Sequence, residues 1–218
     1  MGYRLREGLS FCITGGRAIF LDVDADRYFG LHPQWDEAFQ QLVRGNAQTQ
    51  VLPQLIHAGI LLETAAQSAP ILPAAVPRAL REIHPVVRSP FSRQSLVFIL
   101  AQLRAAIKLK TTPLGVIIAQ ITEEGPTGPI EWGTPQLAMC IDICSAFSSC
   151  RALRWRAGHC LTSSIAFLSV VRGAGMEARL VLGVSAAPFS AHCWVQAGDC
   201  VLNDRLENVR PFEPLLAI

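Results

Sequence analysis

Two stretches in the last third of the chain decide how the sequence is interpreted: RAGHCLTSSIAFLSVVRGAG at residues 156–175 and AHCWVQAGDCVLND at residues 191–204. In the first stretch, Cys160 directly precedes an apolar pattern with helical spacing, made by Leu161, Ile165, Leu168 and Val171. It predicts a helix that begins at the cysteine and ends at RGAG. The second stretch has strand composition on both sides of a glycine, which predicts a β-hairpin.

A cysteine at the first residue of a helix can be a small core residue or a nucleophile. The unpaired amides of a helix N-terminus favour the thiolate and can stabilise an oxyanion, which indicates the nucleophile. His192 and Asp204 are then the candidate base and orienting carboxylate, although His192 alone is more often a satisfied core histidine. His159 is adjacent to Cys160 and diverges from it, and Cys193 should point to the opposite face of its strand from His192.

The register of the hairpin decides whether His192 can reach Asp204. A three-residue loop at Ala197-Gly198-Asp199 places these two residues opposite each other. A two-residue turn at Ala197-Gly198 instead pairs His192 with Asn203, which would then be the orienting residue. Because the base needs a carboxylate to fix its tautomer, we expect the three-residue loop, or a bulge that restores the same pairing.

Before the cysteine, the chain reads as mainly helical. Residues 92–119 have Leu96, Ile99, Leu100, Leu103 and Ile107 along one face, and Pro113 limits or kinks the end of that pattern. From Thr134 onward a second, largely buried helix is predicted. Its Cys140 and Cys144 share one face, and we interpret them as core residues because no third or fourth metal ligand is evident nearby. After the cysteine helix, MEARLVLGV predicts a strand with Ala178, Leu180, Leu182 and Val184 on one side.

Residues 1–64 have a different pattern. FCIT and AIFLDVDADRYFGL have strand composition, and DAD suggests a turn within the second of them. PQWDEAFQQLVRG and TQVLPQLIHAG predict two helices, with Gly45 ending the first, and ILLE predicts a closing strand. This order suggests a small winged-helix module. Residues 65–90 begin with an Ala- and Pro-rich, nearly uncharged run and are predicted to be a linker, which leaves 91–218 as a second domain.

Composition narrows the class of protein. Half of the 218 residues are hydrophobic and 17% are charged, so the chain can form a substantial core. Residues 1–64 carry five Arg against seven acids, a charge of −2, and no segment concentrates positive charge as nucleic-acid binding requires. Nothing reads as a membrane span or a signal peptide. Seven cysteines without a CxxC pair indicate reduced thiols and a cytoplasmic protein.

The segment GHCLTSSIAFLSVVRGAGMEARLVLGV…PFSAHCWVQAGDCVLND resembles the transglutaminase-like cysteine peptidase domain of lasso-peptide B proteins. These proteins remove the leader from a ribosomally made precursor. The resemblance implies an α+β fold and a catalytic triad of Cys160, His192 and Asp204, with no metal or cofactor. Ser163 stands where an arginine is frequent in that family and Cys193 where alanine is common, so local substrate contacts are expected to differ.

The N-terminal segments AIFLDVDADRYFGLHPQWDEAFQQL and LIHAGILLE are similar to the winged-helix precursor-recognition element related to pyrroloquinoline-quinone D proteins. The likeness implies a leader-binding domain at 1–64 fused to a peptidase domain at 91–218. A leader would add as a strand to Arg27, Tyr28, Phe29, Gly30 and Leu31, flanked by Leu52, Leu55 and Ile56, some of which are expected to be core residues instead. Because Tyr28 and Phe29 alternate faces, one should meet the peptide and the other the core.

The implied partners are the leader of a precursor peptide and an ATP-dependent macrolactam synthetase, with neither nucleic acid nor a membrane span. Two other functions remain open from the sequence. One is a transglutaminase-like acyltransferase that uses the same triad, and the other is a non-catalytic peptide-binding scaffold.

Overall fold

The protein is described by a computed structural model that covers residues 2–46, 52–64, 70–86, 93–126, 130, 132–150 and 160–218. Helices and sheets are mixed along the chain, which confirms the predicted α+β class. The strands are β1 (Gly2–Leu5), β2 (Leu9–Thr14), β3 (Arg17–Asp22), β4 (Arg27–Gly30), β5 (Leu61–Thr64), β6 (Arg81–Glu82), β7 (Arg179–Ala186), β8 (Phe189–Ala197), β9 (Cys200–Val201) and β10 (Glu213–Ala217). The helices are α1 (Pro33–Val43), α2 (Leu52–His57), α3 (Arg93–Thr111), α4 (Leu114–Glu123), α5 (Thr134–Ser149), α6 (Cys160–Gly173) and α7 (Leu206–Val209).

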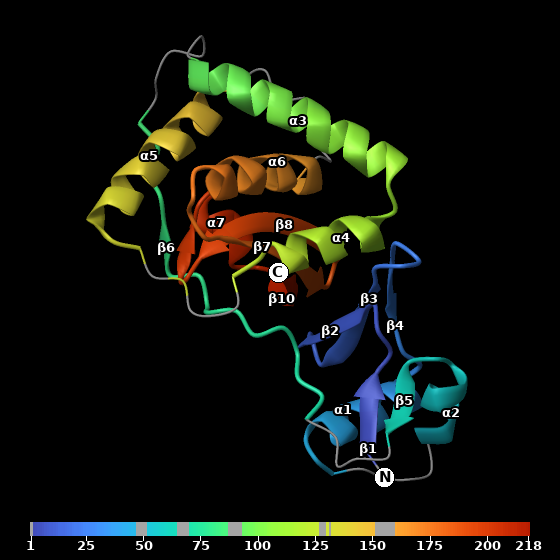
Figure 1. Cartoon of the computed structure of the whole chain (residues 1–218). Helices are drawn as coiled ribbons and strands as arrows, with labels where there is room; N and C mark the ends of the chain where they lie inside the picture. The colour runs from blue at the N-terminus through green and yellow to red at the C-terminus, as the bar shows by residue number, and fades with distance from the viewer. Residues whose placement is uncertain are drawn as a thin grey trace.

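The C-terminal half is built on a five-stranded sheet in the order β10-β7-β8-β9-β6 (Figure 1). The β7 side chains predicted to share one face, including Leu180, Leu182 and Val184, pack with α6 in the main hydrophobic core. Helices α3, α4 and α5 surround α6 on that same side of the sheet (Figure 1). Since β-strand side chains alternate, Val181 and Trp194 point to the other face of the sheet.

That other face is covered partly by the segment predicted to be a linker. Val76 and Ala79 pack against the small cluster around Trp194 and Val181. A few residues later, β6 pairs in parallel with β9 at the edge of the sheet. This part of the Ala- and Pro-rich segment therefore contributes a strand and a covering layer to the C-terminal sheet. A linker that only joined two domains would make neither contact.

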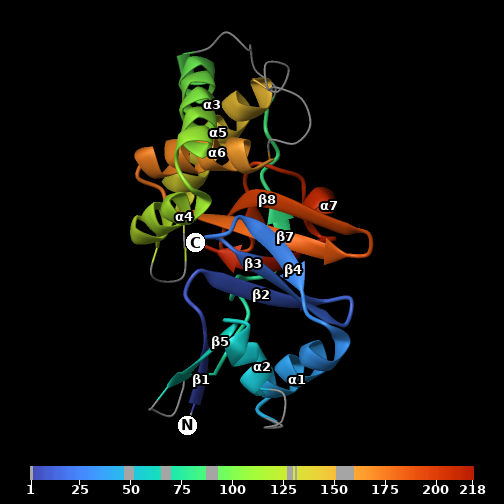
Figure 2. The ribbon, with the colours of Figure 1, turned by 90° about the vertical axis from the view of Figure 1, so that its right-hand side faces the viewer.

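The N-terminal half contains an antiparallel β2-β3-β4 sheet, helices α1 and α2, and a β1–β5 pair. The predicted strands and helices are confirmed where the structure describes them, including the end of α1 before Gly45, whose φ is 82°, whereas the predicted start of the second helix at Thr49 lies outside the described residues. One face of the sheet packs on the two helices through Phe11 and Phe20. Its other face, with Cys12 and Leu21, enters the core of the C-terminal half, beside β7 and β10 (Figure 2). A winged-helix form for this half stays a prediction.

Helix α3 is present as predicted and ends before Pro113, after which α4 begins. Its orientation is unexpected, because Ser95, Phe98, Ala101 and Ala105 are the side chains it buries. The larger aliphatic side chains that the sequence places on one face point outward instead. Small residues at the contact let α3 approach α6 closely. In α5, Cys140 and Cys144 are buried in the core as predicted.

Candidate active site

Cys160 is the first residue of α6 and is half-buried, so its sulfur lies at the helix N-terminus. A side-chain hydrogen bond to His192 is the main cause that lowers the pKa of the Cys160 thiol. Burial opposes this shift, while hydrogen bonds from the backbone N–H groups of Cys193 and Leu161 reinforce it. These two amides point at the sulfur, where they stabilise negative charge. Gly158 and His159, which precede the cysteine, lie outside the described residues.

His192 lies on β8 between the thiol and a carboxylate. Its Nε2 is 2.7 Å from Oδ2 of Asp204. Hydrogen bonds to Asp204 and then to Cys160 raise the pKa of His192 to about 9, although burial opposes the shift. Because Nε2 is engaged by the carboxylate, Nδ1 is the ring nitrogen left to face the sulfur. The pair therefore favours a thiolate beside an imidazolium at neutral pH.

Both oxygens of the Asp204 carboxylate are hydrogen-bonded. Oδ2 accepts from His192, and Oδ1 accepts from the backbone N–H of Arg205 at 2.7 Å and from Nδ2 of Asn208 at 2.8 Å. Burial alone would raise the pKa of Asp204, but these three donors lower it. The carboxylate thus stays ionised and holds the histidine ring in one orientation.

The hairpin that brings His192 and Asp204 together has a different turn from the one predicted. Gln196 pairs with Val201 and Ala197 with Cys200, so the turn is a two-residue one at Gly198-Asp199. The three-residue loop is therefore wrong, and this register continued regularly would send Asp204 to the other face. It does not continue, because β9 ends at Val201 and the side-chain Oδ1 of Asn203 accepts the Val195 N–H at 2.8 Å. This irregularity after β9 brings Asp204 back to His192, as expected for the alternative of a register-restoring bulge.

Asn203 also ties the hairpin to the nucleophile helix. Its Nδ2 donates to Oγ of Ser164 at 2.9 Å, and that hydroxyl donates to the carbonyl of Cys193 at 2.9 Å. Ser164 is fully buried and lies one helical turn after Cys160. The alternating strand pattern indicated neither residue as part of this network. The available signal was two polar side chains, Ser164 and Asn203, within otherwise apolar segments.

A glycine and a tryptophan support the histidine ring. Gly183 is the cross-strand partner of His192, and a Cβ there would lie 2.8 Å from Cη2 and Cζ3 of Trp194. The Trp194 ring stacks on His192 with centroids 6.1 Å apart, and Phe212 packs near the same ring at 5.1 Å. A glycine inside a strand often marks such a close approach, and this was the sequence signal for it.

The loop that carries Asp204 is held from β6. Glu82 Oε2 accepts a short hydrogen bond from the Leu206 N–H at the start of α7. The same loop lines a cavity of about 940 Å³, which is bounded by β6, α5 and α7 and has Asp204 and Asn203 in its wall. The Asp204 loop is therefore fixed by the segment that crosses from the N-terminal half.

Four of the residues predicted to bind a leader line one groove of about 240 Å³ in the N-terminal half, namely Arg27, Phe29, Gly30 and Leu31. The opposite wall is Ala58, Gly59 and Ile60 rather than the helix before them. Leu52 and Leu55 are core residues with at most 2% exposure, and Ile56 packs against the same core. The prediction is therefore wrong for Leu52 and Leu55, because α2 turns these side chains inward, while the place of the partly buried Ile56 beside the groove stays a prediction.

Tyr28 points away from that groove, on the other face of β4. It packs against the main core and meets Phe189 of β8 with ring centroids 5.7 Å apart. Burial, and then the nearby charges of Cys193 and Cys160, raise the pKa of Tyr28 to about 12. Phe29, the next residue, stacks on Phe20 in the other core and lines the groove. The expected division between the two faces of β4 therefore holds, with Phe29 on the groove side.

The described residues contain no group of three or more His, Cys, Asp or Glu side chains that could hold a metal ion. Burial raises the pKa of the Cys193 thiol, which lies in the core on the face of β8 opposite His192. Burial likewise raises the pKa of Cys200 to about 11. Cys160, by contrast, has a lowered pKa and a basic partner.

Comparisons with known proteins identify the family of the chain. A family model for the Transglutaminase-like superfamily matches residues 99–217. The Microcin J25-processing protein McjB from Escherichia coli is 42% identical to this chain over 45 residues, which is 21% of this chain and 22% of that protein. No solved structure matches. These matches support the resemblance to lasso-peptide B proteins, and the chain belongs to the transglutaminase-like superfamily.

Proposed function

We propose that the protein is a cysteine peptidase that removes the leader from a lasso-peptide precursor. The observation that carries this proposal is the arrangement of Cys160, His192 and Asp204. A thiol with a lowered pKa at a helix N-terminus is hydrogen-bonded to an imidazole, and a carboxylate orients that ring. This constellation suits nucleophilic attack on a peptide carbonyl.

In the proposed reaction, the Cys160 thiolate attacks the scissile carbonyl and forms a C–S bond. The oxyanion that develops is stabilised by the amides of Leu161 and Cys193, which already point at the sulfur. The imidazolium of His192 gives its proton to the leaving amine, and the C–N bond breaks. His192 then takes a proton from water, which attacks the thioester and releases the leader acid.

The leader is proposed to dock in the groove of the N-terminal half. Arg27, Phe29, Gly30 and Leu31 supply one side, with the strand edge of β4 available for an extended peptide. The charge of Arg27 and the ring of Phe29 suit a segment with both acidic and apolar residues. In this proposal residues 1–64 form the recognition domain and residues 91–218 the peptidase domain.

The proposed partners extend to a macrolactam synthetase that consumes ATP and closes the ring with the freed amine. The same proposal places the protein in the cytoplasm, where the Cys160 thiolate stays reduced. No cofactor takes part in the proposed hydrolysis. A transglutaminase-like acyl transfer would use the same triad but would deliver the acyl group to an amine instead of water.

The test compares Cys160→Ala with Cys200→Ala, a second half-buried cysteine outside the triad. Each variant receives the cognate precursor peptide, and mass spectrometry follows the products while calorimetry measures leader binding. We expect Cys160→Ala to abolish cleavage with leader binding retained, and Cys200→Ala to cleave normally. Continued cleavage by Cys160→Ala would refute the assignment, and a crosslinked product in place of free leader would favour acyl transfer.

A further inference from the structure

Helix α3 is turned with its large aliphatic side chains outward. Leu96, Leu100, Leu103 and Ile107 follow the spacing of one helical face and form what we call the outer stripe. These four side chains are 52–60% exposed, and Val97 and Ile99 beside them are exposed as well. A contiguous exposed face of this kind is unusual on a protein surface and marks an interaction site.

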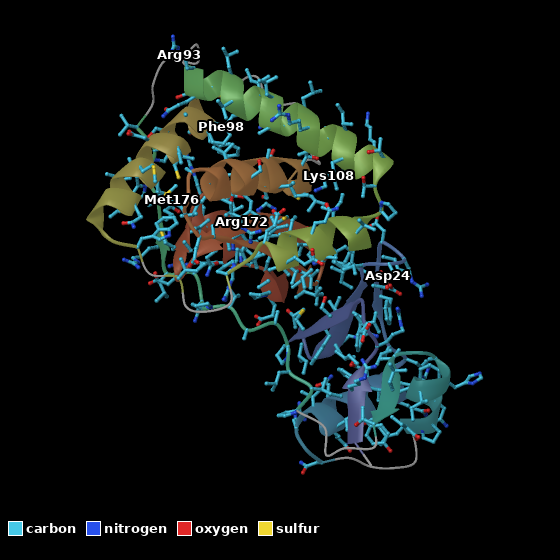
Figure 3. All side chains as sticks on the ribbon, in the orientation of Figure 1. Asp24, Arg93, Phe98, Lys108, Arg172 and Met176 are labelled. Atoms are coloured by element: carbon cyan, nitrogen blue, oxygen red, sulfur yellow. The ribbon has the colours of Figure 1, made fainter. Side chains whose placement is uncertain are left out.

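The opposite side of α3 already has its partner inside the protein. Phe98 points inward, where it meets Phe147 of α5 and Phe167 of α6 at centroid distances of 5.3 and 6.0 Å (Figure 3). Ala101 and Ala105 are buried on the same side. The outer stripe is therefore not needed for the packing of α3 on the core, because other residues of the helix make those contacts.

The charged residues of α3 itself are all positive. Arg93, Arg104, Lys108 and Lys110 lie on α3, and the last two are the only lysines of the chain. At the helical period, Arg104 and Lys110 fall on opposite borders of the stripe. No acidic residue occurs from Pro85 to Thr122. An aliphatic face bordered by cations on both sides is complementary to a surface that is apolar inside and anionic at its edge.

A second copy of the chain would bring these cations against one another, so charge argues against self-pairing through α3. A helix that pairs with another protein usually carries charges of both signs, which set its register. The stripe contains only aliphatic side chains and no hydrogen-bonding group, so it supplies little directional recognition. α3 also lies at the end of the molecule remote from α1 and α2 (Figures 1 and 2).

We propose that α3 docks the protein on an anionic membrane surface. The outer stripe enters the boundary of the acyl chains, and the bordering cations contact lipid phosphates. None of the described helices is long and apolar enough to cross a membrane, and a helix lying in the interface needs no such length. This orientation keeps the groove, which is lined by residues of α1 and of the turn after α2, at the end of the molecule remote from the membrane, and it is independent of the reaction at Cys160.

The experiment measures cosedimentation of the full chain with two kinds of vesicle: pure phosphatidylcholine, and phosphatidylcholine with about a third phosphatidylglycerol. We expect binding to the anionic vesicles, little to the neutral ones, and about a tenfold or greater loss at high salt. The variant Leu96→Ser/Leu100→Ser/Leu103→Ser should lose about tenfold or more in affinity. The control Leu72→Ser/Leu80→Ser changes two leucines of equal or greater exposure and should bind like the parent.

The variant Arg104→Gln/Lys110→Gln tests the charge separately and does not depend on how the leucine variant folds. It should also weaken anionic-vesicle binding by about tenfold, while Arg78→Gln, at an exposed site far from α3, should not. Absence of binding to either vesicle would overturn the proposal and would favour another protein as the partner of this face. Unchanged binding by the folded leucine variant, or by the charge variant, would overturn it too.

Discussion

Replacing Asp204 with Asn tests whether the carboxylate fixes the histidine tautomer. In the native site, Oδ1 accepts two hydrogen bonds and Oδ2 accepts one from His192 Nε2. An amide has a single oxygen. It satisfies more donors when that oxygen faces Arg205 and Asn208, and its NH2 group then faces His192. The ring must in that case accept at Nε2 and carry its proton on Nδ1, so it cannot receive the proton of Cys160.

The size of the effect follows from the number of donors. If the Asn side chain keeps the productive histidine tautomer, its NH2 group faces the two donors of Arg205 and Asn208, which lose their acceptor. Each unsatisfied donor costs about 1–3 kcal/mol, or about 2–6 kcal/mol together. That range corresponds to about 30-fold to about 10⁴-fold suppression of the productive form. The Asp204 side chain is 21% exposed, so water offsets part of the cost. We therefore expect a loss of about 30-fold to about 300-fold in cleavage rate.

Two assays report this loss. Single-turnover cleavage of the precursor peptide measures the chemical step, and iodoacetamide alkylation against pH measures the thiolate of Cys160 without a substrate. The other cysteines are buried, apart from Cys200, whose pKa of about 11 keeps it slow. Asp199→Asn is the matched control, because Asp199 pairs with the exposed Arg81 at the hairpin turn. Cleavage of Asp204→Asn within threefold of the parent, with an unchanged alkylation profile, would refute the reasoning.

Three further outcomes are expected. Gly183→Ala should displace the Trp194 ring, destabilise the fold by about 1–3 kcal/mol and slow cleavage. The control Gly173→Ala, whose added Cβ has no atom within 4 Å, should change neither the stability in a urea melt nor the cleavage rate. Glu82→Ala removes the acceptor for the Leu206 N–H and should lower the free energy of unfolding by about 1–2 kcal/mol. Glu207→Ala, which removes only an exposed ion pair, should not lower it measurably, and equal urea melts for the two variants would contradict this expectation. Cleavage should follow a bell-shaped pH profile: it falls in acid as the Cys160 thiolate, whose pKa is lowered, takes up a proton, and in alkali above about 9 as the His192 imidazolium loses one. An alkaline limb near the ordinary histidine pKa would contradict the link to Asp204.

The sequence predicted the segments that have a clear period. The helix over Cys160–Gly173, the inward face of β7 and the strands of the N-terminal sheet follow from hydrophobic spacing and turn residues, and the structure agrees. The hairpin turn did not follow, because Gly198 suits more than one loop. The irregularity that corrects the register depends on the Asn203 side chain replacing a backbone partner, which no alternation pattern encodes.

The orientation of α3 was hidden for a similar reason. A helix with leucines on one face and small residues on the other can pack on either side, and the leucine face is the usual choice. Here close approach to α6 selects Ala101 and Ala105, and the leucines remain outside. One wall of the N-terminal groove could be predicted, since the side chains of β4 alternate between the two faces of the strand. Its second wall depends on how the turn after α2 folds over β4, which is a long-range property.

Strand β4 places its two aromatic residues in different surroundings. Phe29 borders the groove, and Tyr28, its direct neighbour, packs on the other face against the same core as Cys160. The sheet that carries them is packed into the cores of both halves, so groove and thiol are held at a fixed separation. Under the proposed function, a leader docked in that groove would be cut at a position set by the number of residues between groove and thiol rather than by their identity. β4 would then fix the distance between the docking site and the cleavage site. Inserting residues into that stretch of a leader would either move the cleavage position or make the extra residues loop out.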